Sequence, residues 1–124
     1  ESSAASDVYK RQPIDFDDCG YGLKLYDLAV TLAQSSNYFK RVGKKESSLS
    51  KKALIDGYKK YQKLTNEDVE ILPYLVAARG LAMLGWLHER SDNPELGNYL
   101  KKNISTRIEQ IKRDTDQAHL KTYF

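Results

Sequence analysis

The segment from 71 to 87 constrains the fold of this chain more than any other part of the sequence, because Arg79 is its only charged residue. A helix of this composition is apolar nearly all round, which is typical of a buried element. We therefore expect a long helix over about 65–90, with a kink or a break at Pro73. This helix should be the central, enclosed element, with the other helices packed around it.

Two further helices are expected before this segment. Apolar residues at 25, 28, 29, 32 and 33 follow the spacing of one helix face. The polar run "SSN" at 35–37 should fray the end of that helix after about four turns. A second helix, capped by Ser48 or Ser50, should end near Leu64 and carry positions 54, 58 and 61 on one face.

Capping signals predict where the last two helices begin. Thr65 with Asp68 three residues later fits the capping-box pattern at the start of the apolar helix. The sequence "SDNPE" supplies a cap and places Pro94 at the first position of a fourth, amphipathic helix. Its pattern fades after Asp114, so residues 115–124 are expected to form a tail.

Composition narrows the class of protein. A chain of 124 residues matches one domain, and its net charge of +3 comes without a block of five or more basic residues, so we expect no nucleic-acid partner. No uninterrupted run of 18 apolar residues exists, so we expect no membrane partner. A lone cysteine, Cys19, favours a cytoplasmic location. The sequence leaves the oligomeric state open.

The segment "PIDFDDCGYG" at 13–22 crowds Asp15, Asp17 and Asp18 behind an apolar residue. If "PIDF" is a short strand, Asp15 and Asp17 lie on the same side of it. Two carboxylates about 4 Å apart repel by roughly 4 kcal/mol at an effective dielectric constant near 20, so a cation, an arginine or solvation must offset the repulsion. Mg²⁺ commonly binds one or two carboxylates together with phosphates. By residues alone, a metal site and an exposed helix-capping turn remain equally open.

A calcium EF-hand loop is the nearest rival among metal sites. Asp15, Asp17 and Gly20 fall at its positions 1, 3 and 6. However, Tyr26 stands at position 12, where a bidentate glutamate is needed, and no helix is expected before the loop. These departures argue against an EF-hand.

The seventeen residues "IDFDDCGYGLKLYDLAV" resemble the segment that follows the catalytic loop in the aminoglycoside phosphotransferase and choline kinase-like family. The resemblance implies a mainly α fold over 13–114: the helical C-terminal lobe of a protein-kinase-like fold, with one short strand and the acidic turn at its N-terminal edge. It implies the C-terminal portion of an ATP-dependent kinase that phosphorylates a hydroxyl of a small acceptor, such as an aminoglycoside, choline or homoserine. Residues 1–12, which resemble a translated sequencing adaptor, would be non-native or disordered.

The resemblance also implies roles for individual residues. Asp15 matches the family's counterpart of the kinase Asp-Phe-Gly aspartate, which holds Mg²⁺ on the nucleotide phosphates, and Asp17 is a second candidate for the same metal. Asp18 is expected to be solvated or helix-capping. Asp27, in "YDLA", matches an acid that braces the catalytic loop, and we expect it to be buried and hydrogen-bonded. The general base, and the lobe that binds most of the ATP, are expected upstream, so no catalytic residue is expected here.

Arg79, Trp86 and Glu89 are the candidates for contact with the acceptor, because the acceptor of such kinases lies among the C-terminal helices. For Arg79, a core salt bridge is favoured over a contact with the acceptor. Trp86 is expected to lie in the core and His88 on the surface. Two alternatives from other classes stay open. One is a helical binding module that uses the apolar helix as a partner groove, and the other is a cation-binding protein without catalysis.

Overall fold

A computed structural model of the chain describes residue 20, residues 22–43 and residues 48–124. These residues form four helices and no strand: α2 (Lys24–Arg41), α3 (Ser48–Lys59), α4 (Asn66–Glu89) and α5 (Pro94–His119). The prediction of a mainly helical chain is therefore confirmed. The predicted strand at 13–16 lies outside the described residues.

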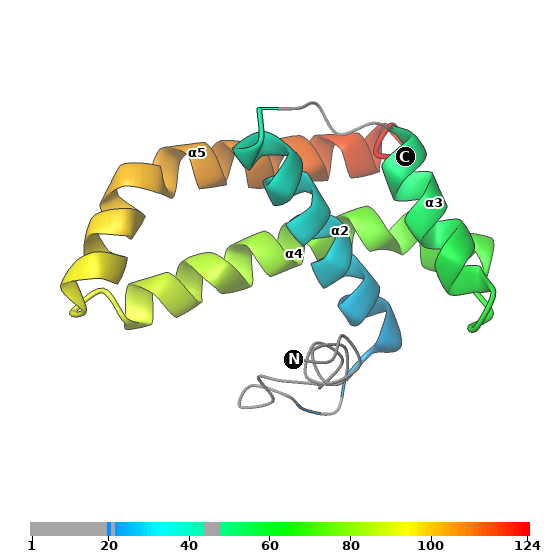
Figure 1. The fold of residues 1–124 in the computed structure, drawn as a ribbon, viewed down its shortest axis with the longest axis horizontal. Helices are drawn as coiled ribbons and strands as arrows, with labels where there is room; N and C mark the ends of the chain where they lie inside the picture. Colours follow the sequence, from blue (N-terminus) through cyan, green and yellow to red (C-terminus); the bar gives the residue numbers. More distant parts are fainter. Residues whose placement is uncertain (1–19, 21, 44–47) are drawn as a thin grey trace, which may run out of the picture.

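The helices are arranged around a long antiparallel pair. α4 and α5 lie side by side and are joined by a short turn, and α2 crosses them (Figure 1). α4 contacts both α2 and α5, so it is the central helix of the described chain. α3 lies at the end of the molecule where α4 begins and α5 ends (Figure 1).

The hydrophobic core lies where α2, α3 and the first half of α4 meet. Leu32 and Leu72 are its largest fully buried side chains, and full burial of a leucine contributes about 1.5–3 kcal/mol. The predicted apolar face of the first helix is the face that α2 buries. Three helices and the C-terminal segment supply the buried members of this core: Leu28, Ala29, Leu32, Ile55, Leu72, Val76 and Tyr123.

The C-terminal segment is tied to α3 through Tyr123, which is only 4% exposed. Lys51 Nζ donates a hydrogen bond to the backbone oxygen of Tyr123 at 2.8 Å. The same ammonium lies 3.6 Å from the centroid of the Tyr123 ring, a cation–π contact. The last residues of the sequence therefore complete the core.

Side-chain caps set the starts of α4 and α5, as the sequence predicts. Thr65 Oγ1 accepts a hydrogen bond from the Asp68 N–H at 3.1 Å, and Asp68 Oδ2 accepts one from the Thr65 N–H at 2.8 Å. Asn93 Oδ1 accepts from the Glu95 N–H at 3.0 Å, and Pro94 opens α5. Both capping predictions are confirmed.

Three helix ends differ from the predictions. α2 continues through "SSN" to Arg41, because serine and asparagine disfavour a helix by only a few tenths of a kcal/mol, roughly, and packing can override that preference. α3 ends at Lys59, so Tyr61 follows the helix and is 86% exposed. α5 continues past 114 to His119, and Tyr123 beyond it is buried.

α4 runs through Pro73 without a break, so of the two predicted outcomes, a kink or a break, the break does not occur. Pro73 is buried at the end of α4 that packs into the core, where packing offsets the lost backbone hydrogen bond. α4 is also not enclosed: Ile71 is 47% exposed and Leu81 is 60% exposed. By length and composition alone α4 could cross a membrane, a criterion that the core helix of a water-soluble domain also meets.

Candidate functional site

The predicted metal ligands Asp15 and Asp17 lie outside the described residues, as does Asp18. The magnesium site therefore stays a prediction. Within residues 22–43 and 48–124, no three or more His, Cys, Asp or Glu side chains form a group that could hold a metal ion. The described chain contributes the helix that follows the acidic segment, α2, which begins at Lys24.

Asp27 lies in the first turn of α2, and its side chain is exposed rather than buried. The expectation of burial is wrong because the next two residues, Leu28 and Ala29, take the buried face of α2. No described residue donates a hydrogen bond to its carboxylate, although its backbone oxygen accepts one from Thr31 Oγ1 at 2.9 Å. A carboxylate in this position stabilises the positive end of a helix by about 0.3–1 kcal/mol.

A groove of about 560 Å³ opens between the second half of α2, the middle of α4, and α5. This volume lies within the range of about 300–1,000 Å³ that is usual for small-molecule sites. Its charged and aromatic lining residues are Tyr38, Arg41, Arg79, Tyr99, Arg107 and Asp114. This groove between three helices is therefore a candidate binding site.

A close approach of α4 and α5 forms part of the groove. Gly80 on α4 and Ile111 on α5 both line it. A Cβ atom on Gly80 would lie 2.6 Å from Ile111 Cγ1, so the glycine lets the two helices pack closely here. This packing brings arginines from both helices to one groove.

Arg79 is partly buried and lines the groove. No described carboxylate forms an ion pair with it, so the expected core salt bridge is not formed with any residue that the structure describes. Because Arg79 is only partly buried, its guanidinium does not bear the full free-energy cost of an unpaired interior charge. Its contact with an acceptor stays a prediction.

Arg107 is held in place by Tyr99, two turns earlier on α5. Arg107 Nη2 donates a hydrogen bond to the Tyr99 hydroxyl oxygen at 2.8 Å, and the guanidinium carbon lies 5.3 Å from the centroid of the Tyr99 ring. Arg107 Nε is buried and has no acceptor among the described residues. An unsatisfied buried donor costs about 1–3 kcal/mol, so an acceptor that binds at Arg107 Nε would relieve this cost.

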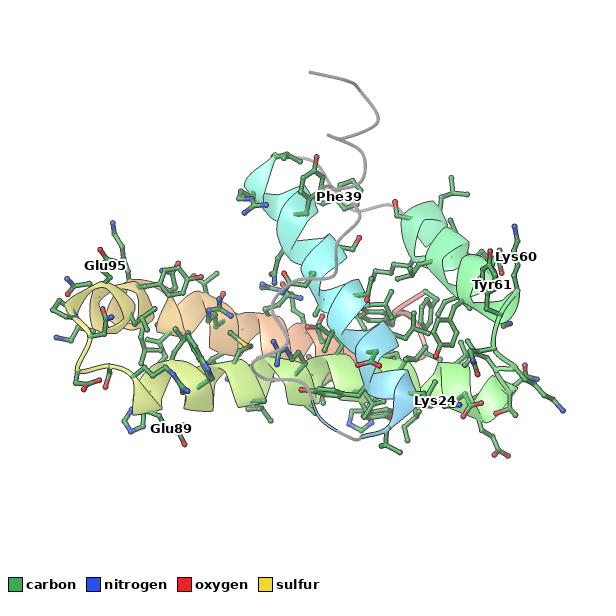
Figure 2. The ribbon with its side chains drawn as sticks, turned by 60° about the horizontal axis from the view of Figure 1, so that its bottom comes forward. Lys24, Phe39, Lys60, Tyr61, Glu89 and Glu95 are labelled. Carbon is green, nitrogen blue, oxygen red and sulfur yellow. The ribbon has the colours of Figure 1, made fainter. Side chains whose placement is uncertain are left out.

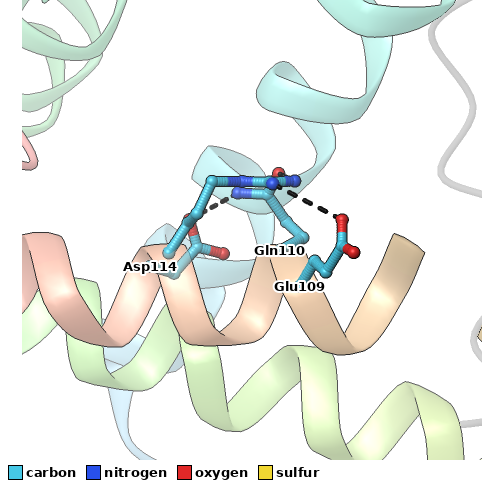
Figure 3. A network of polar contacts seen from close by, with 4 residues as sticks. Glu109, Gln110 and Asp114 are labelled. Atoms are coloured by element: carbon cyan, nitrogen blue, oxygen red, sulfur yellow. Dashed lines mark hydrogen bonds and ion pairs between the residues drawn. The ribbon is translucent and has the colours of Figure 1, made fainter. Parts of the chain in front are cut away.

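Asp114 belongs to a network of polar side chains along α5 (Figure 3). Gln110 Nε2 donates to Asp114 Oδ1 at 2.8 Å, and Gln110 Oε1 accepts from Arg113 Nη2 at 3.2 Å. Arg113 also pairs with Glu109 at 3.8 Å. Among the described residues that line the groove, Asp114 is the only acid, and it accepts a hydrogen bond from Gln110 of its own helix.

Trp86 and Glu89 lie near the end of α4, outside the residues that line the groove. Figure 2 shows Glu89 and Glu95 at the same end of the molecule. The Arg90 guanidinium carbon lies 4.4 Å from the centroid of the Trp86 ring, and Arg90 Nη1 lies 3.6 Å from Glu89 Oε2. Trp86 is 36% exposed, so its expected place in the core is wrong, whereas His88 is exposed as expected. The structure does not bring Trp86 and Glu89 together with Arg79.

Sequence reasoning missed most of the groove, including Arg41, Tyr99 and Arg107. A signal was present in α5, where positions 99, 103, 107, 110 and 114 are polar and recur at the spacing of one helix face. All five positions line the groove. The prediction for this helix rested on its apolar residues, and the polar face was not considered as a binding surface.

No protein-family model, curated protein or solved structure matches this chain. The function is therefore argued from two features of the chain itself. One is the sequence motif at 14–30, and the other is the arginine-lined groove between α2, α4 and α5.

Proposed function

We propose that this chain is the helical C-terminal lobe of an ATP-dependent kinase that phosphorylates a hydroxyl group of a small molecule in the cytoplasm. The observation that carries the proposal is the seventeen-residue segment at 14–30, whose residues resemble the metal-binding segment of the aminoglycoside phosphotransferase and choline kinase-like family. In this proposal Asp15, assisted by Asp17, holds the Mg²⁺ that bridges the phosphates of ATP.

The anchoring of α2 supports the proposal. A metal ligand works only if the elements around it are rigid. The second half of the motif lies in α2, where Leu28, Ala29 and Leu32 are at most 2% exposed and pack in the core with Leu72 of α4. The acidic half therefore precedes a helix with a fixed position.

The residues of this chain would supply some parts of the active site of such a kinase, and upstream sequence would supply the others. Phosphoryl transfer depends mainly on positioning and on electrostatic stabilisation of the transferred group. Asp15 would supply a metal ligand, and Arg79 would line the acceptor pocket. The general base and most of the ATP site would come from sequence upstream, so this portion alone should not catalyse transfer.

The upstream reading frame in the source DNA tests this proposal first. We expect a His-Gly-Asp loop with a downstream asparagine shortly before Pro13. In the protein encoded by the whole frame, Asp15→Ala should lower ATP turnover at least about 100-fold, because the metal would lose a direct ligand. Asp18→Ala, which removes a neighbouring carboxylate, is the matched control and should stay within a few-fold of the parent. A start codon directly before Ser2 or Pro13, or full turnover in Asp15→Ala, would overturn the proposal.

A helical binding module is the second candidate, favoured by the exposed apolar side chains of α4. Ile71 and Leu81 are 47% and 60% exposed, and α2 and α5 cover the opposite face of the helix. In such a module the acidic turn only caps α2. It predicts no heat of Mn²⁺ binding at Asp15 by titration calorimetry, whereas the kinase proposal predicts binding that Asp15→Ala removes.

A further inference from the structure

The described lining of the groove carries a net positive charge. Among the described residues, its charged lining consists of three arginines, Arg41, Arg79 and Arg107, and one carboxylate, Asp114. The arginines come from α2, α4 and α5, so their charges gather around one space rather than along one helix. A concave, partly apolar lining focuses such charges and strengthens their attraction for an anion.

Acidic residues of the described chain do not neutralise the groove arginines. No described carboxylate forms an ion pair with any of the three groove arginines. Asp114 lines the groove together with these arginines, and it accepts a hydrogen bond from Gln110. Three ion pairs neutralise cations outside the groove: Arg90–Glu89, Arg113–Glu109 and Lys121–Glu70.

Arg107 is the arginine best prepared to hold an anion. A guanidinium has five N–H donors in a planar fork that matches a phosphate or a carboxylate. The Tyr99 hydroxyl accepts from one donor of Arg107 and fixes the direction of the side chain. A side chain that is already fixed loses less conformational entropy when a ligand binds.

Neutral polar residues complete the lining. Gln34 and Asn37 from α2, and Asn103 from α5, offer amide donors and acceptors that suit hydroxyl groups. In the part of the lining that the structure describes, three arginines outnumber one carboxylate, so an anion is attracted more strongly than a cation. The groove therefore suits a small molecule with both hydroxyl groups and a negative charge.

We propose that the groove binds a small hydroxyl compound that carries a phosphate or a carboxylate group, with Arg107 and Arg79 holding that group. The identification of this compound as the phosphoryl acceptor rests on the kinase function proposed above, and it then excludes cationic acceptors such as aminoglycosides and choline. The preference for an anion is independent of that function.

Nuclear magnetic resonance of the whole chain tests this proposal. The chain is titrated with glycerol 3-phosphate, glycerate, glycerol and choline at low ionic strength, and the Nε–Hε signals of the arginines are followed. We expect saturable shifts of the Arg79 and Arg107 signals with one or both anions, and none with glycerol or choline. Comparison of the two anions shows whether phosphate or carboxylate is preferred.

Charge-removing variants separate a built site from general attraction. Arg107→Gln and Arg79→Gln should each weaken anion binding at least tenfold. Lys121→Gln and Arg90→Gln remove the same charge outside the lining and should change binding less than about twofold, since exposed charges are screened. If Arg107→Gln fails to fold, Arg79→Gln still decides, because Arg79 makes no hydrogen bond to a described residue.

The outcomes distinguish this inference from the proposed function. Equal losses in all four variants, shifts that do not saturate, or saturable binding of choline would overturn the inference and leave the kinase proposal standing. Anion binding that needs Arg79 and Arg107, in a chain whose upstream frame lacks the catalytic loop, would support the anion site and reject its identification as an acceptor site.

Discussion

The two halves of α4 have similar composition but different surroundings (Figure 1). In the first half, Leu72 is fully buried and Val76 is 4% exposed, because α2, α3 and Tyr123 all pack there. In the second half, Leu87 is 3% exposed but Leu81 is 60% exposed. An apolar sequence thus predicts a helix that buries some face, while the number of neighbouring elements decides how much of it is covered.

Close packing in the second half of α4 depends on glycines rather than on many neighbours. Gly97 lies in the first turn of α5 and is buried. A Cβ on it would collide with the backbone oxygen of Ser91. Gly80 has a different role, because a Cβ on it would collide with the side chain of Ile111 on the facing helix. The two glycines therefore allow close approaches in the α4–α5 hairpin, one in its turn and one between its helices.

Leu72→Ala should have the largest effect on stability. Its side chain has no exposed surface, so the substitution removes buried methylene groups and leaves a cavity. We expect the free energy of unfolding to fall by about 2–5 kcal/mol in urea titrations. A loss below about 1 kcal/mol would mean that the first half of α4 is no better packed than the second half.

Gly97→Ala should have the next largest effect, since it tests the tight turn of the hairpin. The new methyl group meets backbone rather than a flexible side chain, so the chain must shift, and we expect a loss of about 1–3 kcal/mol in the same titrations. Gly85→Ala is the matched control. No atom lies within 4 Å of its Cβ position, so it should gain about 0.5–1 kcal/mol from helix propensity. Destabilisation by both variants would show that general helix disturbance, not the turn, is responsible.

Leu81→Ala should have the smallest effect. With 60% of its surface exposed, Leu81 loses little burial, and we expect a change within about 0.5 kcal/mol. The measurement is made at two protein concentrations. A loss comparable to that of Leu72→Ala, present only at the higher concentration, would show that this face is covered in solution and would remove the contrast between the two halves.

Local signals in the sequence predicted local structure well. The Thr65–Asp68 capping box and the Asn93–Pro94 start of α5 depend on residues within one turn of each other, and both are confirmed. The end of α2 was missed, because "SSN" favours a stop that the rest of the fold overrides. The role of Tyr123 was missed because its partners are far away in the sequence.

In the candidate groove too, some residues could be identified from local sequence signals and others could not. Arg79 could be singled out from the sequence, because a lone charge on an apolar helix needs a special environment. Arg107 and Tyr99 could not, since an arginine and a tyrosine on a polar helix face are ordinary in a sequence. Their meaning depends on the packing of α5 against α4 at Gly80, which no local pattern reveals.

The contact between Lys51 and Tyr123 has a consequence for the synthesis of the chain. These residues are separated by 72 positions, yet their contact joins α3 to the segment that completes the core. Contacts between distant positions slow folding, because a long loop must close before they form. A ribosome releases α2, α3 and α4 before Tyr123, so the nascent helices wait with Leu32 and Leu72 incompletely covered. Transiently exposed apolar surface of this kind makes a folding chain prone to aggregate.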